Sequence, residues 1–249
     1  MTKKTQARPQ TSPNPELNIW EHSAGLRALY ARRAEGLEEE MDASAQAAEL
    51  LASFIRASPT PPRLLDAGCG SGYLWHSFRR RGLAVEYHGL DFSPGLIEIG
   101  RRILPAHGVP AERLLRGRLE DLHGRQFEAA ALINTLTFCP DFHEPLERLA
   151  DCGLKALVIR DNFGDRTLIR WETDGFLDPG WNHLQGYWNQ WSRAEVTAFL
   201  EERGFTVEAV EDIRTRGRAE AVVGKPYHWS WLRAFRTSGP IFLASWEQK

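Results

Sequence analysis

Short apolar runs and longer helical patterns alternate along the chain from residue 63 onward. The apolar runs predict β-strands at 63–67, 83–92, 113–117, 127–133, 155–160, 205–213 and 241–246. Apolar residues spaced three or four positions apart predict helices at 72–81, from 94, at 145–152 and from 193. This alternation is typical of an α/β fold with a doubly wound, mainly parallel sheet and helices on both faces.

The N-terminal part of the chain precedes this alternation. Residues 1–15 are polar and proline-rich, so we expect a disordered tail there. Within residues 16–60, apolar side chains such as Leu51 and Ile55 share one helical face, and several prolines follow Ser58. We therefore expect a helical cap over 16–60, which together with the alternating region forms one domain over 16–249.

Composition and charge exclude several classes of protein. The 249 residues hold 31 Lys plus Arg against 33 Asp plus Glu, which argues against a protein that coats nucleic acid or an anionic membrane. Apolar runs are too short for a membrane span, and the N-terminus lacks the apolar core of a secretory signal. Cys69, Cys139 and Cys152 form no C-x-x-C pair, so we expect free thiols in a reducing, cytoplasmic compartment and no metal site.

A glycine-rich loop follows the first predicted strand. Gly68, Gly70 and Gly72 let the backbone turn sharply and let a ligand approach closely. Tyr73 stands where the dinucleotide pattern G-x-G-x-x-G has its last glycine. The glycines of that pattern let a pyrophosphate approach the backbone, so a ligand without pyrophosphate does not require all of them. Asp91 ends the next strand, where a carboxylate accepts hydrogen bonds from ribose hydroxyls.

With these motifs, the chain resembles the class I S-adenosylmethionine-dependent methyltransferases. LLDAGCGSG and GLDFSP are similar to the first two motifs of that family, RGRLEDL to the stretch beside the adenine, and FEAAALINTLTFCPD to the strand and loop facing the methionine part. The resemblance covers about residues 60–249. It implies a Rossmann-like, seven-stranded sheet, S-adenosylmethionine as methyl donor and S-adenosylhomocysteine as product.

The same resemblance implies roles for individual residues. The aminocarboxypropyl end of the cofactor would be held by Asp66, Gly68, Cys69, Gly70 and Gly72, the ribose by Asp91, the adenine by Phe92, Leu119 and Glu120, and the methionine end by Asn134. Arg118 stands where the family often has an Asp that contacts adenine. Tyr30 and Arg33 fall where such enzymes fold an N-terminal segment over the cofactor, although an amphipathic surface helix explains them equally well.

Residues 161–191 interrupt the alternation with an irregular insert after the fifth strand, where the family commonly builds the acceptor pocket. The insert carries five acidic and two basic residues and four tryptophans: Trp171, Trp181, Trp188 and Trp191. Aromatic walls suit a small molecule, and the acidic balance favours a neutral or cationic one. The alternative is that these tryptophans only cover the sheet. His183 and Asn162 are the candidate catalytic residues, although an isolated His is more often structural.

A basic segment at 214–237 offers a competing interpretation. It carries six basic residues with Tyr227, His228, Trp229 and Trp231 between them. Three explanations stay open: a solvated basic face, a subsite for an acceptor phosphate or carboxylate, and binding of single-stranded RNA.

The sequence therefore predicts methyl transfer from S-adenosylmethionine to oxygen or nitrogen of a small-molecule acceptor, with nucleic-acid binding and membrane association not expected. The alternatives are an RNA or protein methyltransferase and a cofactor-binding domain without catalytic activity. The oligomeric state is left open.

Overall fold

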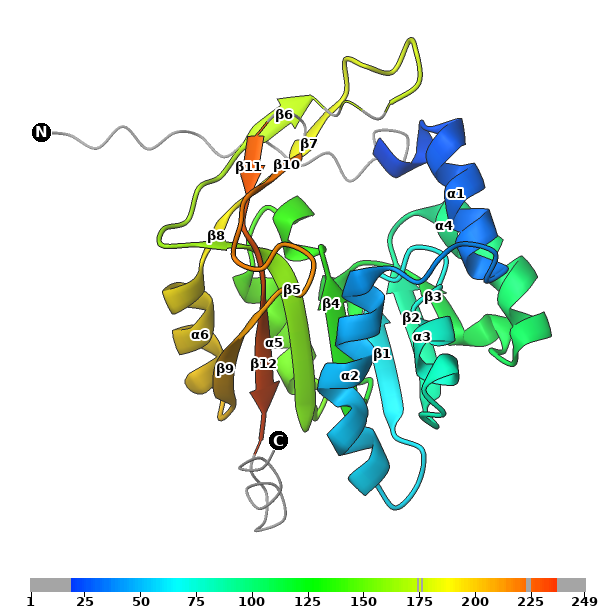
Figure 1. Cartoon of the computed structure of the whole chain (residues 1–249), viewed down its shortest axis with the longest axis vertical. Helices are drawn as coiled ribbons and strands as arrows, with labels where there is room; N and C mark the ends of the chain where they lie inside the picture. The colour runs from blue at the N-terminus through cyan, green and yellow to red at the C-terminus, as the bar shows by residue number, and fades with distance from the viewer. Residues whose placement is uncertain (1–18, 174, 176, 223–224, 237–249) are drawn as a thin grey trace, which may run out of the picture.

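The fold is a central β-sheet between two layers of helices (Figure 1), taken from a computed structural model that describes residues 19–173, 175, 177–222 and 225–236. Along its main path the sheet has the strand order β3-β2-β1-β4-β5-β12-β9. The strands are β1 (Arg63–Ala67), β2 (Glu86–Asp91), β3 (Leu114–Arg116), β4 (Ala129–Ile133), β5 (Ala156–Gly164), β9 (Thr206–Glu211) and β12 (Trp229–Phe235). Only β12 pairs antiparallel to its neighbours on this path, so the predicted doubly wound, mainly parallel sheet is confirmed.

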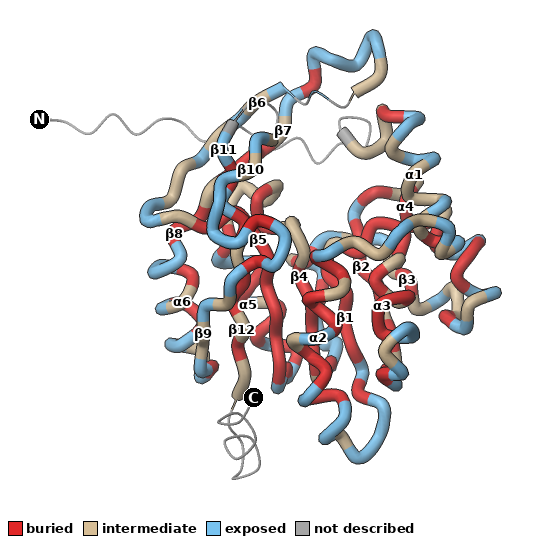
Figure 2. The backbone as a smooth tube through the Cα atoms, in the orientation of Figure 1, coloured by how far each residue is buried: buried red, intermediate tan, exposed pale blue. Residues whose placement is uncertain are grey.

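The helices lie on both faces because successive residues of each strand point to opposite sides. Leu64 packs into one hydrophobic cluster and Leu65 into the other. The first cluster is covered by α2 (Asp42–Ala57), α3 (Trp75–Arg80) and α4 (Pro94–Ile103), the second by α5 (His143–Asp151) and α6 (Arg193–Glu201). Figure 2 shows this buried interior running the length of the sheet.

Two departures from the predicted strands change the interpretation of the chain. β5 runs to Gly164 rather than to residue 160, so the first residues of the expected insert belong to the sheet. The basic segment contains β12, in which Trp229 and Trp231 are buried. The strand expected at 241–246 and the tail expected at 1–15 lie outside the described residues.

Above the carboxyl ends of the parallel strands lie the cap and the insert (Figure 1). Of the described part of the cap expected over 16–60, only the short helix η2 (Ile19–Glu21) and α1 (Ala24–Ala34) lie there, and they are called the cap below, whereas α2 covers a face of the sheet. The insert forms a two-stranded hairpin of β6 (Trp171–Thr173) and β7 (Gln185–Tyr187), and then β8 (Trp191–Ser192) pairs with the end of β5. A second hairpin, β10 (Glu220–Val222) with β11 (Lys225–Tyr227), lies beside the first.

A third, smaller hydrophobic cluster joins these upper elements. Leu184, Trp188, Tyr227 and Trp229 form its buried part. Trp20 of the cap and Phe138 of η6 (Leu136–Phe138) pack against it. The roof over the strand ends is therefore held by its own apolar contacts. No helix in the described part of the chain is both long and apolar enough to cross a bilayer.

A buried ion pair below the roof connects β5 to Asp212, the residue that follows β9. The Arg160 Nε atom of β5 lies 2.5 Å from Asp212 Oδ2, and the two side chains are 4% and 1% exposed. The same guanidinium donates to Asn134 Oδ1 at 2.5 Å, so the pair also orients the end of β4. Removing one partner leaves the other charge buried without compensation.

We expect Asp212→Ala to lower the free energy of unfolding by about 3–5 kcal/mol in urea titrations, because Arg160 loses its counter-ion. Glu220→Ala is the matched control, since it breaks the Arg214–Glu220 pair, whose side chains are 55% and 30% exposed, and should cost less than about 1 kcal/mol. Equal effects of the two substitutions would contradict this account of the Arg160–Asp212 pair.

Candidate functional site

The glycine loop joins β1 to the turn before α3. Gly68, Gly70 and Gly72 have φ angles of 83°, 56° and 81°, in the left-handed region that favours glycine. A Cβ at Gly68 would lie 2.2 Å from Thr135 Oγ1, and one at Gly70 would lie 2.4 Å from Tyr30 Cε1. The N–H groups of Gly68 and Cys69 donate to the Leu90 carbonyl oxygen. The loop is thus packed closely against the ends of β2 and β4 and against the cap.

Asp91, the last residue of β2, connects this loop to α4. Its Oδ2 atom accepts a hydrogen bond from the Gly70 N–H at 2.8 Å, and Oδ1 accepts one from the Ser93 N–H at 2.9 Å. Burial raises the pKa of Asp91 to about 6, and the nearby Glu21 carboxylate adds to that increase. Each carboxylate oxygen keeps a lone pair beyond the backbone bond it accepts, so Asp91 can accept further hydrogen bonds near neutral pH.

Asp66 lies on the neighbouring strand β1, immediately before the glycine loop. The Tyr87 hydroxyl donates to its Oδ2 atom at 2.5 Å. Burial raises the pKa of Asp66 to about 7, and Asp91 contributes to the increase as a like charge. The two carboxylates therefore lie in one electrostatic environment at the ends of adjacent strands.

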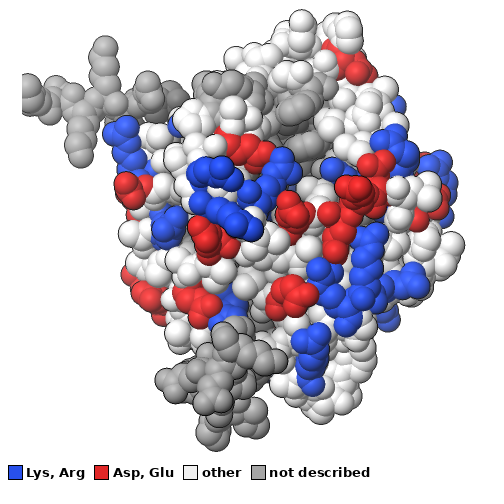
Figure 3. Space-filling model, in the orientation of Figure 1, with Lys and Arg blue, Asp and Glu red and all other residues white. Residues whose placement is uncertain are grey.

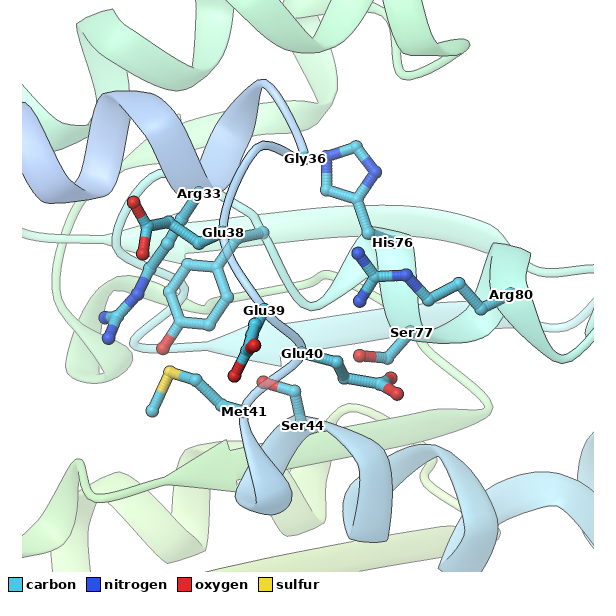
Figure 4. A pocket seen from close by; sticks show the side chains of 11 residues that line it. Arg33, Gly36, Glu38, Glu39, Glu40, Met41, Ser44, His76, Ser77 and Arg80 are labelled. Atoms are coloured by element: carbon cyan, nitrogen blue, oxygen red, sulfur yellow. The ribbon is translucent and has the colours of Figure 1, made fainter.

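The cap folds over the loop through Tyr30 and Arg33. The Ser71 hydroxyl donates to the Tyr30 carbonyl oxygen at 2.8 Å. The Arg33 guanidinium carbon lies 5.4 Å from the Tyr30 ring centroid and 5.2 Å from that of Tyr73. Arg33 also lines a pocket between α3 and the α1–α2 linker, together with His76 (Figure 4). The structure thus brings Tyr30 and Arg33 to the loop.

The end of β4 forms the floor of the site. Asn134 has a φ of 55°, its N–H donates to the Arg160 carbonyl oxygen at 2.7 Å, and its side-chain oxygen is held by the same arginine. The next residue, Thr135, donates its hydroxyl to the Ala67 carbonyl oxygen at 3.0 Å. Asn134 is thus bonded to β5 and its neighbour Thr135 to β1, which fixes the position of the Asn134 side chain at the end of β4.

The residues expected at the adenine lie on the other side of the loop. Leu119 is buried and Glu120 half-buried on η5 (Leu119–Asp121). The Phe92 ring is 38% exposed, and the Arg118 guanidinium carbon lies 5.9 Å from its centroid. Phe92 thus offers an apolar face directly after Asp91.

The four insert tryptophans do not form one wall. Trp191 is buried in the main core beside Phe142, with ring centroids 5.3 Å apart, and Trp188 belongs to the roof cluster. Trp171 and Trp181 are 37% and 41% exposed. The four tryptophans therefore lie in three separate environments: the main core, the roof cluster and the exposed surface.

Asn162 and His183, the two candidate catalytic residues, also differ in burial. Asn162 is fully buried within β5, and its side chain donates to the Asn189 carbonyl oxygen and accepts from the His228 N–H. Both ends of this amide are occupied by backbone groups, which gives Asn162 a structural position rather than one in the site. His183 is exposed, and its ring centroid lies 6.3 Å from that of Trp181.

Sequence reasoning missed Trp20, Glu21 and Phe138. Trp20 lies between the cap and the roof cluster, with ring centroids 6.4 Å from Tyr30 and 5.3 Å from Phe138. Glu21 accepts hydrogen bonds from the Ser93 hydroxyl and, at 2.9 Å, from the Gly95 N–H. Both cap residues lie in a three-residue helix that carries no periodic pattern, so only their residue types could have drawn attention.

The basic segment places its two tryptophans and two of its arginines in contacts within the protein. Its two tryptophans are core residues of β12, Arg233 pairs with Glu208 at 2.6 Å, and Arg236 donates to backbone carbonyl oxygens. On the face shown in Figure 3, acidic side chains lie beside the groups of basic ones. Among the described residues, no group of three or more His, Cys, Asp or Glu side chains is arranged to hold a metal ion.

Comparison with known sequences finds relatives for the part of the chain that carries the glycine loop. Residues 64–152 match the family described as Methyltransferase domain. The Ubiquinone biosynthesis O-methyltransferase of Xanthomonas axonopodis pv. citri (strain 306) is 33% identical over 89 residues, which are 34% of this chain and 36% of that protein. The Malonyl-(acyl-carrier protein) O-methyltransferase of Serratia marcescens is 44% identical over 45 residues, 18% of this chain and 17% of that protein. The matches thus span about a third or less of these curated relatives.

Solved structures share the fold over nearly the whole chain. The 1,6-didemethyltoxoflavin-N1-methyltransferase of Burkholderia thailandensis has a TM-score of 0.56 at 18% identity, covering 93% of each chain. The magnesium protoporphyrin IX methyltransferase of Synechocystis PCC 6803, with bound S-adenosylmethionine, has a TM-score of 0.55 at 15% identity, covering 92% of this chain and 100% of that one. Residues 64–152 thus match a methyltransferase domain, and the sheet built around them has the fold of solved S-adenosylmethionine-dependent methyltransferases.

Proposed function

We propose that the protein transfers a methyl group from S-adenosylmethionine to oxygen or nitrogen of a small-molecule acceptor. The observation that carries this proposal is the glycine loop joined to Asp91 at the carboxyl end of the sheet, directly beneath a cap and an apolar roof. Ligands of open α/β sheets bind at this edge. The family match and the shared fold support a cofactor site there.

The residues of this edge fit the cofactor. A Cβ at Gly68 or Gly70 would collide with Thr135 or Tyr30, so glycine is needed at both positions for the loop to lie against the end of β4 and the cap. Asp91 has lone pairs for the ribose hydroxyls, and Phe92 and Leu119 offer apolar contacts for the adenine. We assign the polar methionine end to Arg33 and Asn134, which lie beside the loop.

The cofactor, when bound, would supply a methyl group on a positively charged sulfur: an acceptor lone pair would form a bond to the methyl carbon in line, and the electrons of the broken C–S bond would stay on sulfur. The chain's own residues then mainly align the acceptor and exclude water. Tyr30 and Trp20 cover the loop from the cap, and the roof cluster closes the opposite side. A protonated acceptor must also release its proton, and the exposed His183 is the candidate for accepting it.

A small-molecule acceptor is favoured by the enclosed apolar roof and by the relatives, whose names include a ubiquinone-biosynthesis O-methyltransferase and a toxoflavin N1-methyltransferase. The test incubates purified protein and methyl-labelled S-adenosylmethionine with three fractions of a cell extract: small molecules, RNA and protein. We expect label only in the small-molecule fraction. Label in RNA or protein would replace the proposed acceptor, and cofactor binding without label in any fraction would indicate a non-catalytic domain.

We expect Asp91→Ala to weaken binding of S-adenosylhomocysteine by about 5- to 150-fold in calorimetric titration, because the ribose hydroxyls lose their acceptor in a buried site. Asp151→Ala on α5 is the control, since that side chain is 68% exposed and should leave the affinity unchanged. An unchanged affinity of the Asp91 variant would remove Asp91 from the cofactor site.

The affinity for S-adenosylhomocysteine should also depend on pH. The pKa of Asp91 is raised to about 6, so the carboxylate form that accepts hydrogen bonds is present above that value and is lost as the pH falls through it. Binding should therefore weaken between pH 7 and pH 5, by at most about tenfold per pH unit below the pKa. Titrations of the wild type and of Asp91→Asn test this. An equally steep dependence in the variant would assign the effect to another group.

A further inference from the structure

Trp20 lies at the junction between the cofactor loop and the roof. On one side its ring faces Tyr30, whose own ring closes the space above Gly70. On the other side it makes an edge-to-face contact with Phe138, at 5.3 Å and 87°. Phe138 follows β4, the strand whose end carries Asn134. Trp20 therefore lies beside the position where an acceptor must meet the cofactor.

The residues that follow Trp20 anchor it on both sides of the site. Glu21 binds Ser93 and Gly95 at the start of α4, two residues beyond Asp91. The carbonyl oxygen of His22 accepts from the Asp178 N–H at 2.9 Å, and the His22 ring stacks on Trp181 at 3.6 Å.

The first residue of α1 completes this anchorage. The Ala24 N–H donates to Asp178 Oδ2 at 2.8 Å. Residues 20–24 thus bridge the cofactor side and the insert, and this bridge holds the indole in place.

The surface beside Trp20 is aromatic rather than charged. Trp20 and Phe138 remain half-buried, while Trp188 and Tyr227 are buried behind them. The Asp161 carboxylate is buried and accepts from the Thr137 and Asn162 N–H groups, and the Asp178 carboxylate accepts from the Ala24 N–H. Two of the acidic side chains of the insert are therefore engaged with backbone groups.

We infer that Trp20 forms one wall of the acceptor site and selects an acceptor with a planar aromatic ring. This inference rests on the proposed function. A flat ring stacks on an indole or meets a phenyl edge more favourably than a puckered saturated ring of the same size. Trp20 is thus a specificity-determining residue, and its neighbours in sequence keep it in position.

The test uses a matched pair of probes, 2,3-dihydroxynaphthalene and its saturated analogue decahydronaphthalene-2,3-diol. They share ring size and hydroxyl positions and differ in planarity and aromatic character. Affinities are measured by calorimetry with the protein saturated with S-adenosylhomocysteine. We expect the aromatic probe to bind about tenfold more tightly than the saturated one. Equal affinities, or no binding of the aromatic probe up to about 1 mM, would overturn the inference.

Variants locate the preference at Trp20. Trp20→Leu keeps an apolar side chain and should reduce the ratio of the two affinities to about one- to threefold, whereas Trp20→Phe should retain part of it. Trp171→Leu is the matched control, because it removes an indole from the exposed part of the same roof and should leave the ratio unchanged. A ratio unchanged in Trp20→Leu, or lost equally in the control, would contradict the assignment.

The affinity for S-adenosylhomocysteine separates this inference from the proposed function. If the wild type does not bind S-adenosylhomocysteine, the proposed function itself fails. If it binds but shows no aromatic preference, only the role of Trp20 fails. A loss of S-adenosylhomocysteine affinity in Trp20→Leu beyond about threefold would make Trp20 a residue of the cofactor site instead and would also overturn the inference.

Discussion

The pair of hydrogen bonds accepted by the Asp91 carboxylate is the interaction on which the rest of the site depends. One oxygen holds the Gly70 N–H of the loop after β1, and the other holds the Ser93 N–H at the start of α4. A buried carboxylate is costly unless it is hydrogen-bonded, and here backbone donors from two segments stabilise it. The left-handed glycines make this convergence possible, because a side chain at Gly68 or Gly70 would collide with Thr135 or Tyr30.

The cap and the insert are built outward from that point. Glu21 binds Ser93 and Gly95, so the cap is attached beside Asp91, and the bridge from His22 and Ala24 to Asp178 then attaches the insert to the cap. The loop, the cap and the roof consequently form a continuous set of contacts. A change that loosens the glycine loop should therefore also loosen the packing of the roof, even though the two are separated by about a hundred residues of sequence.

The sequence predicted the parts of this arrangement that depend on local pattern. The strand expected at 63–67 matches β1, and the glycine loop with Asp91 could be located from residue type and spacing alone. The rest of the arrangement depends on long-range strand pairing, which the local sequence pattern does not show. Asn162 and Trp191 were assigned to an irregular insert, yet pairing with β12 and β8 extends β5 past both Asp161 and Asn162 and buries Trp191. β12 was missed because the basic residues of the 214–237 segment concealed an alternation that becomes apparent once Trp229 and Trp231 are seen to be buried.

The charges of the insert and of the basic segment have to be considered one by one. The insert has an acidic excess in sequence, but a charge acts through what its side chain contacts, and Asp161 and Asp178 are both used to hold backbone N–H groups. Three of the six basic residues at 214–237 are likewise engaged in local contacts: Arg214 with Glu220, Arg233 with Glu208, and Arg236 with backbone carbonyl oxygens. Beside the glycine loop, the aromatic rings of Tyr30, Trp20 and Phe138 lie next to one another. Under the inference that Trp20 lines the acceptor site, shape and stacking therefore contribute to how that site distinguishes one acceptor from another.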